Sequence, residues 1–201
     1  MRITEINPRY QPRADMCFPT TIKIVYDELC KSFGENSSLS LNRISKLSKY
    51  NRGVRDLDYA VTNLNKYLFA KGYRLFEKAG IGIDDRLIDR ILNDGNASAP
   101  IVTVGSSWIA ENDSDLDIDE VPPDDEHELV VLNKDTSKIY VYDTYAPFSR
   151  VQSGLIMPKI EKSIARFLTH WGNANKEILW IEKMKKDVAK NESQKKLLRS
   201  V

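Results

Sequence analysis

Cys17 stands where a cysteine can act as a nucleophile. It lies in the stretch QPRADMCFPTT, six residues after Gln11, and the run IKIVYDELCKSF that follows predicts an amphipathic helix. A thiol at the first turn of a helix feels the unpaired N–H groups and the positive end of the helix dipole, which favour a thiolate. The Cys17 N–H and the Gln11 side-chain amide could both donate hydrogen bonds to a developing oxyanion. These two residues therefore indicate acyl chemistry through a thiol.

His127 and Asp143 could supply the base that such a thiol needs. His127 is one of only two histidines and opens a predicted strand, and Asp143 closes the partner strand after the turn NKDTS. Two antiparallel strands of similar length bring such ends together. The carboxylate could then accept the imidazole N–H and fix its tautomer. The order Cys17, His127, Asp143 thus predicts a catalytic triad, provided that the fold packs the start of the helix against the hairpin.

The other candidate residues favour structural roles. Cys30 continues the apolar face of the predicted helix and lies about thirteen residues from Cys17, roughly 20 Å along the axis, so no disulfide is expected. His170 is expected to interact with the end of its own helix. The acidic run 113–119 lacks the glycine and glutamate that an EF-hand loop needs, and no spacing predicts a zinc or phosphate site. No metal or organic cofactor is expected.

Hydrophobic periodicity sets out the elements that must position these residues. Helices are predicted over residues 17–33, 40–49, 54–72, 84–93 and 158–171. Strands are predicted over residues 73–77, 100–105, 127–132, 138–143 and 177–184. Helices dominate the first half and strands the second, which predicts an α+β domain with N-terminal helices packed on a mostly antiparallel C-terminal sheet.

Length and composition restrict the class of protein. The 201 residues suit one domain, expected over residues 1–184, and 30 basic against 29 acidic residues give no overall field that would attract nucleic acid. No apolar run approaches the length of a membrane span, and the N-terminus has no signal-peptide core. Two cysteines are too few for a secreted disulfide framework. A cytoplasmic location without membrane insertion is therefore expected.

Two charged segments flank or interrupt the predicted domain. Residues 111–126 are rich in aspartate and glutamate, contain two prolines and predict an inserted loop beside the cleft. A negative rim there would favour a basic or amine-bearing substrate. The lysine-rich residues 185–201 predict a solvated C-terminal tail.

The stretch QPRADMCFPTTIKIVYDEL resembles the nucleophile segment of papain-like cysteine peptidases, in particular the bacteriocin-leader (double-glycine) peptidase family. Members of that family show Gln, five intervening residues, Cys, then x-Pro-Thr and a helix. HELVVL, a turn and IYVYD are similar to that family's histidine and aspartate strands, including the interval between the two residues. The likeness covers most of residues 8–184. The family usually occurs fused to a membrane-spanning ABC exporter, and no such segment stands in this sequence.

The resemblance implies a papain-like fold and a peptidase acting on a peptide or protein substrate. Cys17 would be the nucleophile, His127 the proton carrier, Asp143 its orienting partner and Gln11 the oxyanion donor. Two alternatives stay open. A transglutaminase-like or other acyltransferase could use the same triad with an amine in place of water, and a binding or regulatory module could keep the fold without turnover.

Overall fold

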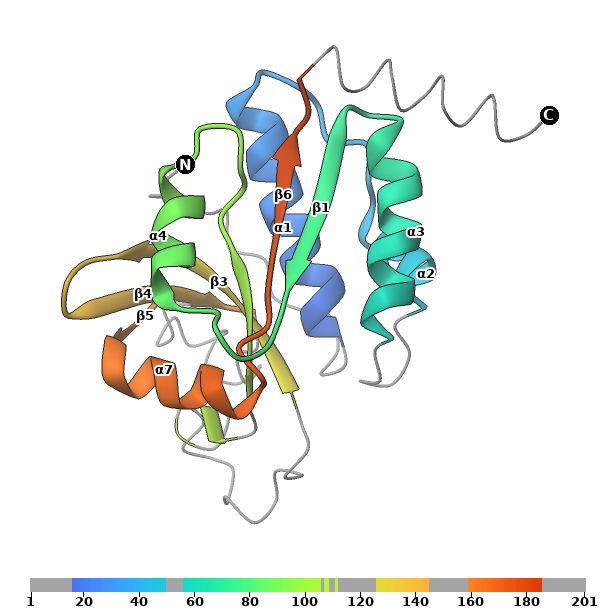
Figure 1. Ribbon diagram of the computed structural model, residues 1–201. Helices are drawn as coiled ribbons and strands as arrows, with labels where there is room; N and C mark the ends of the chain where they lie inside the picture. Colours follow the sequence, from blue (N-terminus) through green and yellow to red (C-terminus); the bar gives the residue numbers. More distant parts are fainter. Residues whose placement is uncertain are drawn as a thin grey trace, which may run out of the picture.

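The computed structural model describes residues 16–49, 56–105, 107–108, 111, 126–144 and 159–185, and these residues form a six-stranded antiparallel sheet with helices on both faces (Figure 1). The order of the strands across the sheet is β1-β6-β2-β3-β4-β5. The strands are β1 (Tyr73–Lys78), β2 (Ile101–Gly105), β3 (Glu126–Lys134), β4 (Lys138–Asp143), β5 (Lys159–Ser163) and β6 (Ile178–Lys183). The helices are α1 (Cys17–Ser32), α2 (Leu41–Ser48), α3 (Leu57–Phe69), α4 (Asp85–Asn93) and α7 (Ile164–Asn173). The predicted α+β class, with helices packed on an antiparallel sheet, is confirmed.

The sheet forms the middle layer because alternate residues of its strands belong to two different cores. Val130 of β3 packs in the core that α1, α2 and α3 cover, and Figure 1 shows α1 behind β6 and β1. Leu129 packs in the opposite core with α4 and α7. Successive side chains of a strand point to opposite faces, so this alternation is what two covered faces require. All five residues of β2 are buried accordingly.

Side-chain caps fix where α2 and α3 begin. Ser40 accepts a hydrogen bond from the backbone N–H of Arg43 at the start of α2, and Asp56 accepts one from that of Tyr59 at the start of α3. Such caps satisfy N–H groups that have no partner inside the helix. The predicted helices and strands up to residue 143 are found with ends shifted by a few residues.

The prediction of one helix over residues 158–171 is wrong in its first part. Residues Lys159–Ser163 form β5, which pairs with β4 along its length, and α7 begins only at Ile164. Ser163 caps that helix by accepting the N–H of Arg166. The edge of β4 offered unpaired backbone groups, and pairing with them overrode the helical spacing of the sequence.

The β3–β4 hairpin contains a β-bulge. Leu129 pairs with Asp143 and Val131 with Val141, but Asn133 then pairs with Tyr140, so β3 has one more residue than β4 over this interval. His127 lies two residues before Leu129 and therefore on the same face as Asp143. The strands bring the two predicted partners onto one side of the sheet.

No helix in the described ranges is long and apolar enough to cross a bilayer. Three regions to which the sequence-based predictions give a role lie outside the described residues. They are Gln11, the acidic residues 112–125 and the tail from residue 186.

Candidate active site

Cys17 is the first residue of α1, with Met16 at the N-cap position. The helix is anchored by fully buried side chains such as Phe18 and Ile22, and it packs on β3. Cys17 itself is 3% exposed. The predicted position of the thiol at the mouth of a helix is therefore found, with the helix held against the strand that begins the hairpin.

His127 and Asp143 form a buried pair beside this thiol. The distance between His127 Nε2 and Asp143 Oδ1 is 2.6 Å, and their side chains are 4% and 8% exposed. The Cys17 side chain is hydrogen-bonded to His127. Because Nε2 faces the carboxylate, Nδ1 is the ring nitrogen left for the thiol. The structure thus brings together three of the four residues that the sequence singles out, and Gln11 lies outside the described residues.

The charge of Asp143 makes His127 a stronger base than a free imidazole. Burial by itself disfavours the imidazolium, but the attraction of Asp143 and the hydrogen bond to it raise the pKa of His127 well above its ordinary value. The hydrogen bond with Cys17 acts in the same direction. His127 can therefore accept a proton from a neighbouring group and hold it.

The thiol differs from the sequence-based expectation. The helix N-terminus was expected to favour a thiolate, yet burial raises the pKa of Cys17 and the negative charge of Glu128 raises it further. The hydrogen bond with His127 lowers the pKa and only partly offsets these effects. The pKa of the resting thiol is thus raised, because loss of solvent and a neighbouring carboxylate outweigh the local field.

Trp108 completes the surroundings of Asp143 and was missed by the sequence-based reasoning. Its indole Nε1 donates a hydrogen bond of 3.0 Å to Asp143 Oδ2, so both carboxylate oxygens are bonded. Trp108 is fully buried, and its ring contacts that of His170 at 5.5 Å between centroids in a T-shaped arrangement. The sequence offers one general indication: the N–H of a buried tryptophan requires a hydrogen-bond acceptor. It does not indicate which residue supplies that acceptor.

His170 belongs to a second polar cluster, and its predicted interaction with its own helix end is wrong. Its Nδ1 lies 2.9 Å from Ser107 Oγ and its Nε2 lies 2.8 Å from Glu111 Oε2. Glu111 also accepts hydrogen bonds from Lys162 and Arg166. Partial burial would raise the pKa of Glu111, but these bonds lower it to about 2. His170 therefore ties α7 to the segment that follows β2.

Cys30 has the structural role that was expected. It lies on the buried face of α1, within the core, and, like Cys17, forms no disulfide. Burial raises the pKa of its thiol. It is thus poorly suited to act as a second nucleophile.

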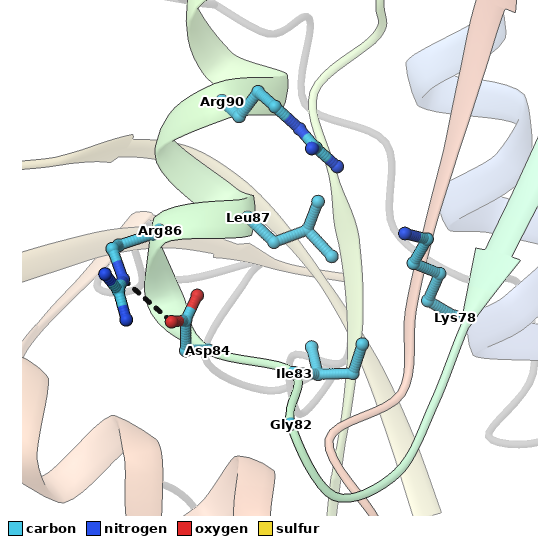
Figure 2. A pocket seen from close by; sticks show the side chains of 7 residues that line it. All are labelled: Lys78, Gly82, Ile83, Asp84, Arg86, Leu87 and Arg90. Atoms are coloured by element: carbon cyan, nitrogen blue, oxygen red, sulfur yellow. Dashed lines mark hydrogen bonds and ion pairs between the residues drawn. The ribbon is translucent and has the colours of Figure 1, made fainter.

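Two cavities lie away from Cys17 and His127. One, of about 320 Å³, has an apolar wall and a rim of basic side chains together with Asp84, which is paired with Arg86. Figure 2 shows Lys78 and Arg90 pointing toward the same opening beside Leu87. The other, of about 550 Å³, is lined by the cluster around His170. The first could receive an anionic group, but Cys17 and His127 line neither cavity.

Comparison with known proteins places the fold among peptidase domains. No family model matches the sequence, and no curated protein matches it. The peptidase domain of Streptococcus ComA, a bi-functional ABC transporter involved in a quorum-sensing pathway, is similar with a TM-score of 0.54 and 16% identity, covering 90% of this chain and 100% of that chain. A putative C39-like peptidase from Bacillus anthracis is similar with a TM-score of 0.59 and 12% identity, covering 92% of this chain and 98% of that chain.

A third solved structure is a double-glycine-motif protease from an AMS/PCAT transporter in complex with the leader peptide. Its TM-score is 0.54 at 9% identity, and the alignment covers 90% of this chain and 93% of that chain. The chain therefore has the papain-like fold of the C39-like, double-glycine peptidase domains, as the resemblance in the sequence implied.

Proposed function

We propose that the protein is a cysteine peptidase that cleaves a peptide or isopeptide bond. One observation carries the proposal: a buried line of contacts runs from Cys17 at the start of α1 through His127 to Asp143. Nucleophile, base and orienting carboxylate in hydrogen-bonding contact are the arrangement that acyl transfer through a thiol requires. The fold shared with peptidase domains supports this reaction class.

The reaction begins when the Cys17 proton moves to His127 Nδ1 and the sulfur attacks the substrate carbonyl carbon. Asp143 stabilises the resulting imidazolium through Nε2, in line with the raised pKa of His127. The carbonyl oxygen becomes an oxyanion, which the Cys17 N–H at the helix start and the Gln11 amide would hold.

Collapse of this intermediate breaks the C–N bond, and the His127 proton passes to the leaving amine. A thioester between Cys17 and the acyl group is left. Water, deprotonated by His127, then attacks the thioester and releases the acid, which restores the thiol. No cofactor enters these steps.

The substrate proposed is a peptide or protein met in the cytoplasm. The acidic residues 112–125 would favour a basic or amine-bearing segment near the scissile bond. Neutralising Asp113, Asp115, Asp117 and Asp119 to Asn should then weaken the preference for basic substrates and its salt dependence.

The central test is cleavage of a proteome-derived peptide library, read by mass spectrometry of new termini. The wild type and Cys30→Ala should cleave it, whereas Cys17→Ala and His127→Ala should lose at least about 1,000-fold in rate. Undiminished cleavage by Cys17→Ala would refute the proposal. A parallel assay with a glutamine donor and a fluorescent amine would reveal a transglutaminase-like activity. Absence of both activities, with no covalent adduct from a peptide aldehyde, would favour a binding module.

A further inference from the structure

Glu128 carries a buried carboxylate that the reaction above does not use. It follows His127 on β3 and is 2% exposed. Neighbouring residues of a strand point to opposite faces of the sheet. Val130, two residues after Glu128, packs in the core beneath α1, whereas Leu129 packs in the core of α4 and α7. Glu128 therefore faces the layer that contains Cys17.

The thiol of Cys17 is in hydrogen-bonding contact with both Glu128 and His127. Cys17 and Glu128 are each at least nine-tenths buried, and electrostatic interactions are strong in such surroundings. A thiol has a single proton, and an ionised carboxylate can only accept a hydrogen bond. The S–H group therefore donates either to the carboxylate or to the imidazole, and the two acceptors compete for it.

The charged groups on the neighbouring elements do not cancel this competition. On β4, Asp143 bonds to His127 through Nε2, the ring nitrogen that is not left for the thiol. On β2, Thr103 pairs directly with Glu128 and donates a hydrogen bond of 2.6 Å to Glu177 Oε1. Asp143 and Glu128 thus act on the Cys17–His127 pair from different sides. Asp143 favours the imidazolium of His127, and Glu128 opposes the thiolate of Cys17.

The raised pKa of the Cys17 thiol agrees with this geometry, since the charge of Glu128 raises it and His127 lowers it. We propose that Glu128 is a positioning residue that keeps the proton on Cys17 in the resting site and restrains its transfer to His127. The proposal rests on the function proposed above, in which Cys17 is the nucleophile. Removing the negative charge while keeping the shape of the side chain should then ease formation of the thiolate.

The test compares Glu128→Gln with its parent in a Cys30→Ala background, where Cys17 is the sole thiol. The ultraviolet absorbance of the thiolate, followed against pH, gives the midpoint of its ionisation without any substrate. Glu128→Gln should lower that midpoint by about one pH unit or more. Glu177→Gln is the matched control, because it removes a nearby carboxylate charge while keeping the acceptor for Thr103, and it should shift the midpoint much less.

An unchanged or higher midpoint in Glu128→Gln would overturn the proposal, and so would an equal shift in Glu177→Gln. If circular dichroism shows that Glu128→Gln does not fold, Glu128→Asp takes its place. That variant keeps the charge but withdraws it by one methylene, so a smaller downward shift is expected. Inactivity toward peptides would count against the proposed function alone. In an active protein, the rising limb of the kcat/KM profile should move with the thiol midpoint.

Discussion

Two histidine–carboxylate pairs contact Trp108, and their carboxylates are neutralised in different ways. Asp143 bonds to His127 and to the neutral indole N–H of Trp108. Glu111 bonds to His170 and also to the permanent cations Lys162 and Arg166. In the first pair the described cationic partner of the carboxylate is the histidine itself, whereas in the second pair two fixed charges are present whatever the histidine does.

This difference suits His127 and Asp143 to proton transfer, and His170 and Glu111 to stabilising the fold. A change of charge on His127 changes the described cationic partner of Asp143, and Cys17 lies beside His127 to deliver the proton. A change of charge on His170 leaves Glu111 still paired with two cations. Similar distances, 2.6 Å and 2.8 Å, therefore support different roles.

The largest effect is expected from Asp143→Asn. Loss of the carboxylate removes the main cause of the raised His127 pKa, so kcat/KM for peptide cleavage should fall by about 1,000-fold or more. The attraction between Asp143 and protonated His127 should stabilise the fold below the unfolded-state pKa of His127, about 6.5. This stabilisation should be lost as the pH rises through the higher pKa of His127 in the folded protein. Chemical denaturation at several pH values should show this slope flattened in Asp143→Asn. An unchanged kcat/KM would remove the distinction between the two pairs.

Trp108→Phe should have an intermediate effect. It deletes the N–H donor to Asp143 and keeps an aromatic ring against His170, and a hydrogen bond to a charged group contributes about 1.5–3 kcal/mol. We expect kcat to fall roughly 10-fold with little change in KM, because the substrate itself is not contacted. A loss of thermal stability with unchanged kcat would assign Trp108 to packing alone.

Glu111→Gln should have the smallest effect on activity, within about 3-fold, and a measurable one on stability, about 1–2 kcal/mol at pH 7. The folded-state pKa of Glu111 is about 2, below the unfolded value of about 4.3. Its contribution is therefore present above the unfolded value and is lost as pH falls toward 2. Denaturation at pH 7 and pH 3 measures the loss. Ser107→Ala, which keeps the ion pairs, should retain both activity and stability.

The sequence predicted those parts of the site that depend on local pattern. The helix at Cys17 and the hairpin that joins His127 to Asp143 follow from periodicity and turn residues close in the chain. Trp108 and Glu111 could not be placed, because their partners lie 35 and 59 residues away and are reached only through packing. The spacing of apolar residues predicts helix where β5 lies, because pairing with β4 is likewise a tertiary effect. The sequence did not indicate Glu128, because its contact with Cys17 depends on the packing of α1 against β3.

The bulge in β3 also determines which length changes the hairpin can tolerate. Beyond the bulge, Asp143 pairs with Leu129 and shares a face with His127. If β3 and β4 paired without this bulge, so that Leu132 faced Val141 while the turn kept its register, Asp143 would pair with Val130 and join Glu128 on the face that α1 covers. His127 would lose its carboxylate, and two carboxylates would meet beside the thiol. An insertion or deletion of one residue that moves Asp143 from Leu129 to its neighbour should therefore abolish the site even when the sheet still forms. Deletion of Leu132 removes the extra residue of the bulge and should keep Asp143 opposite Leu129.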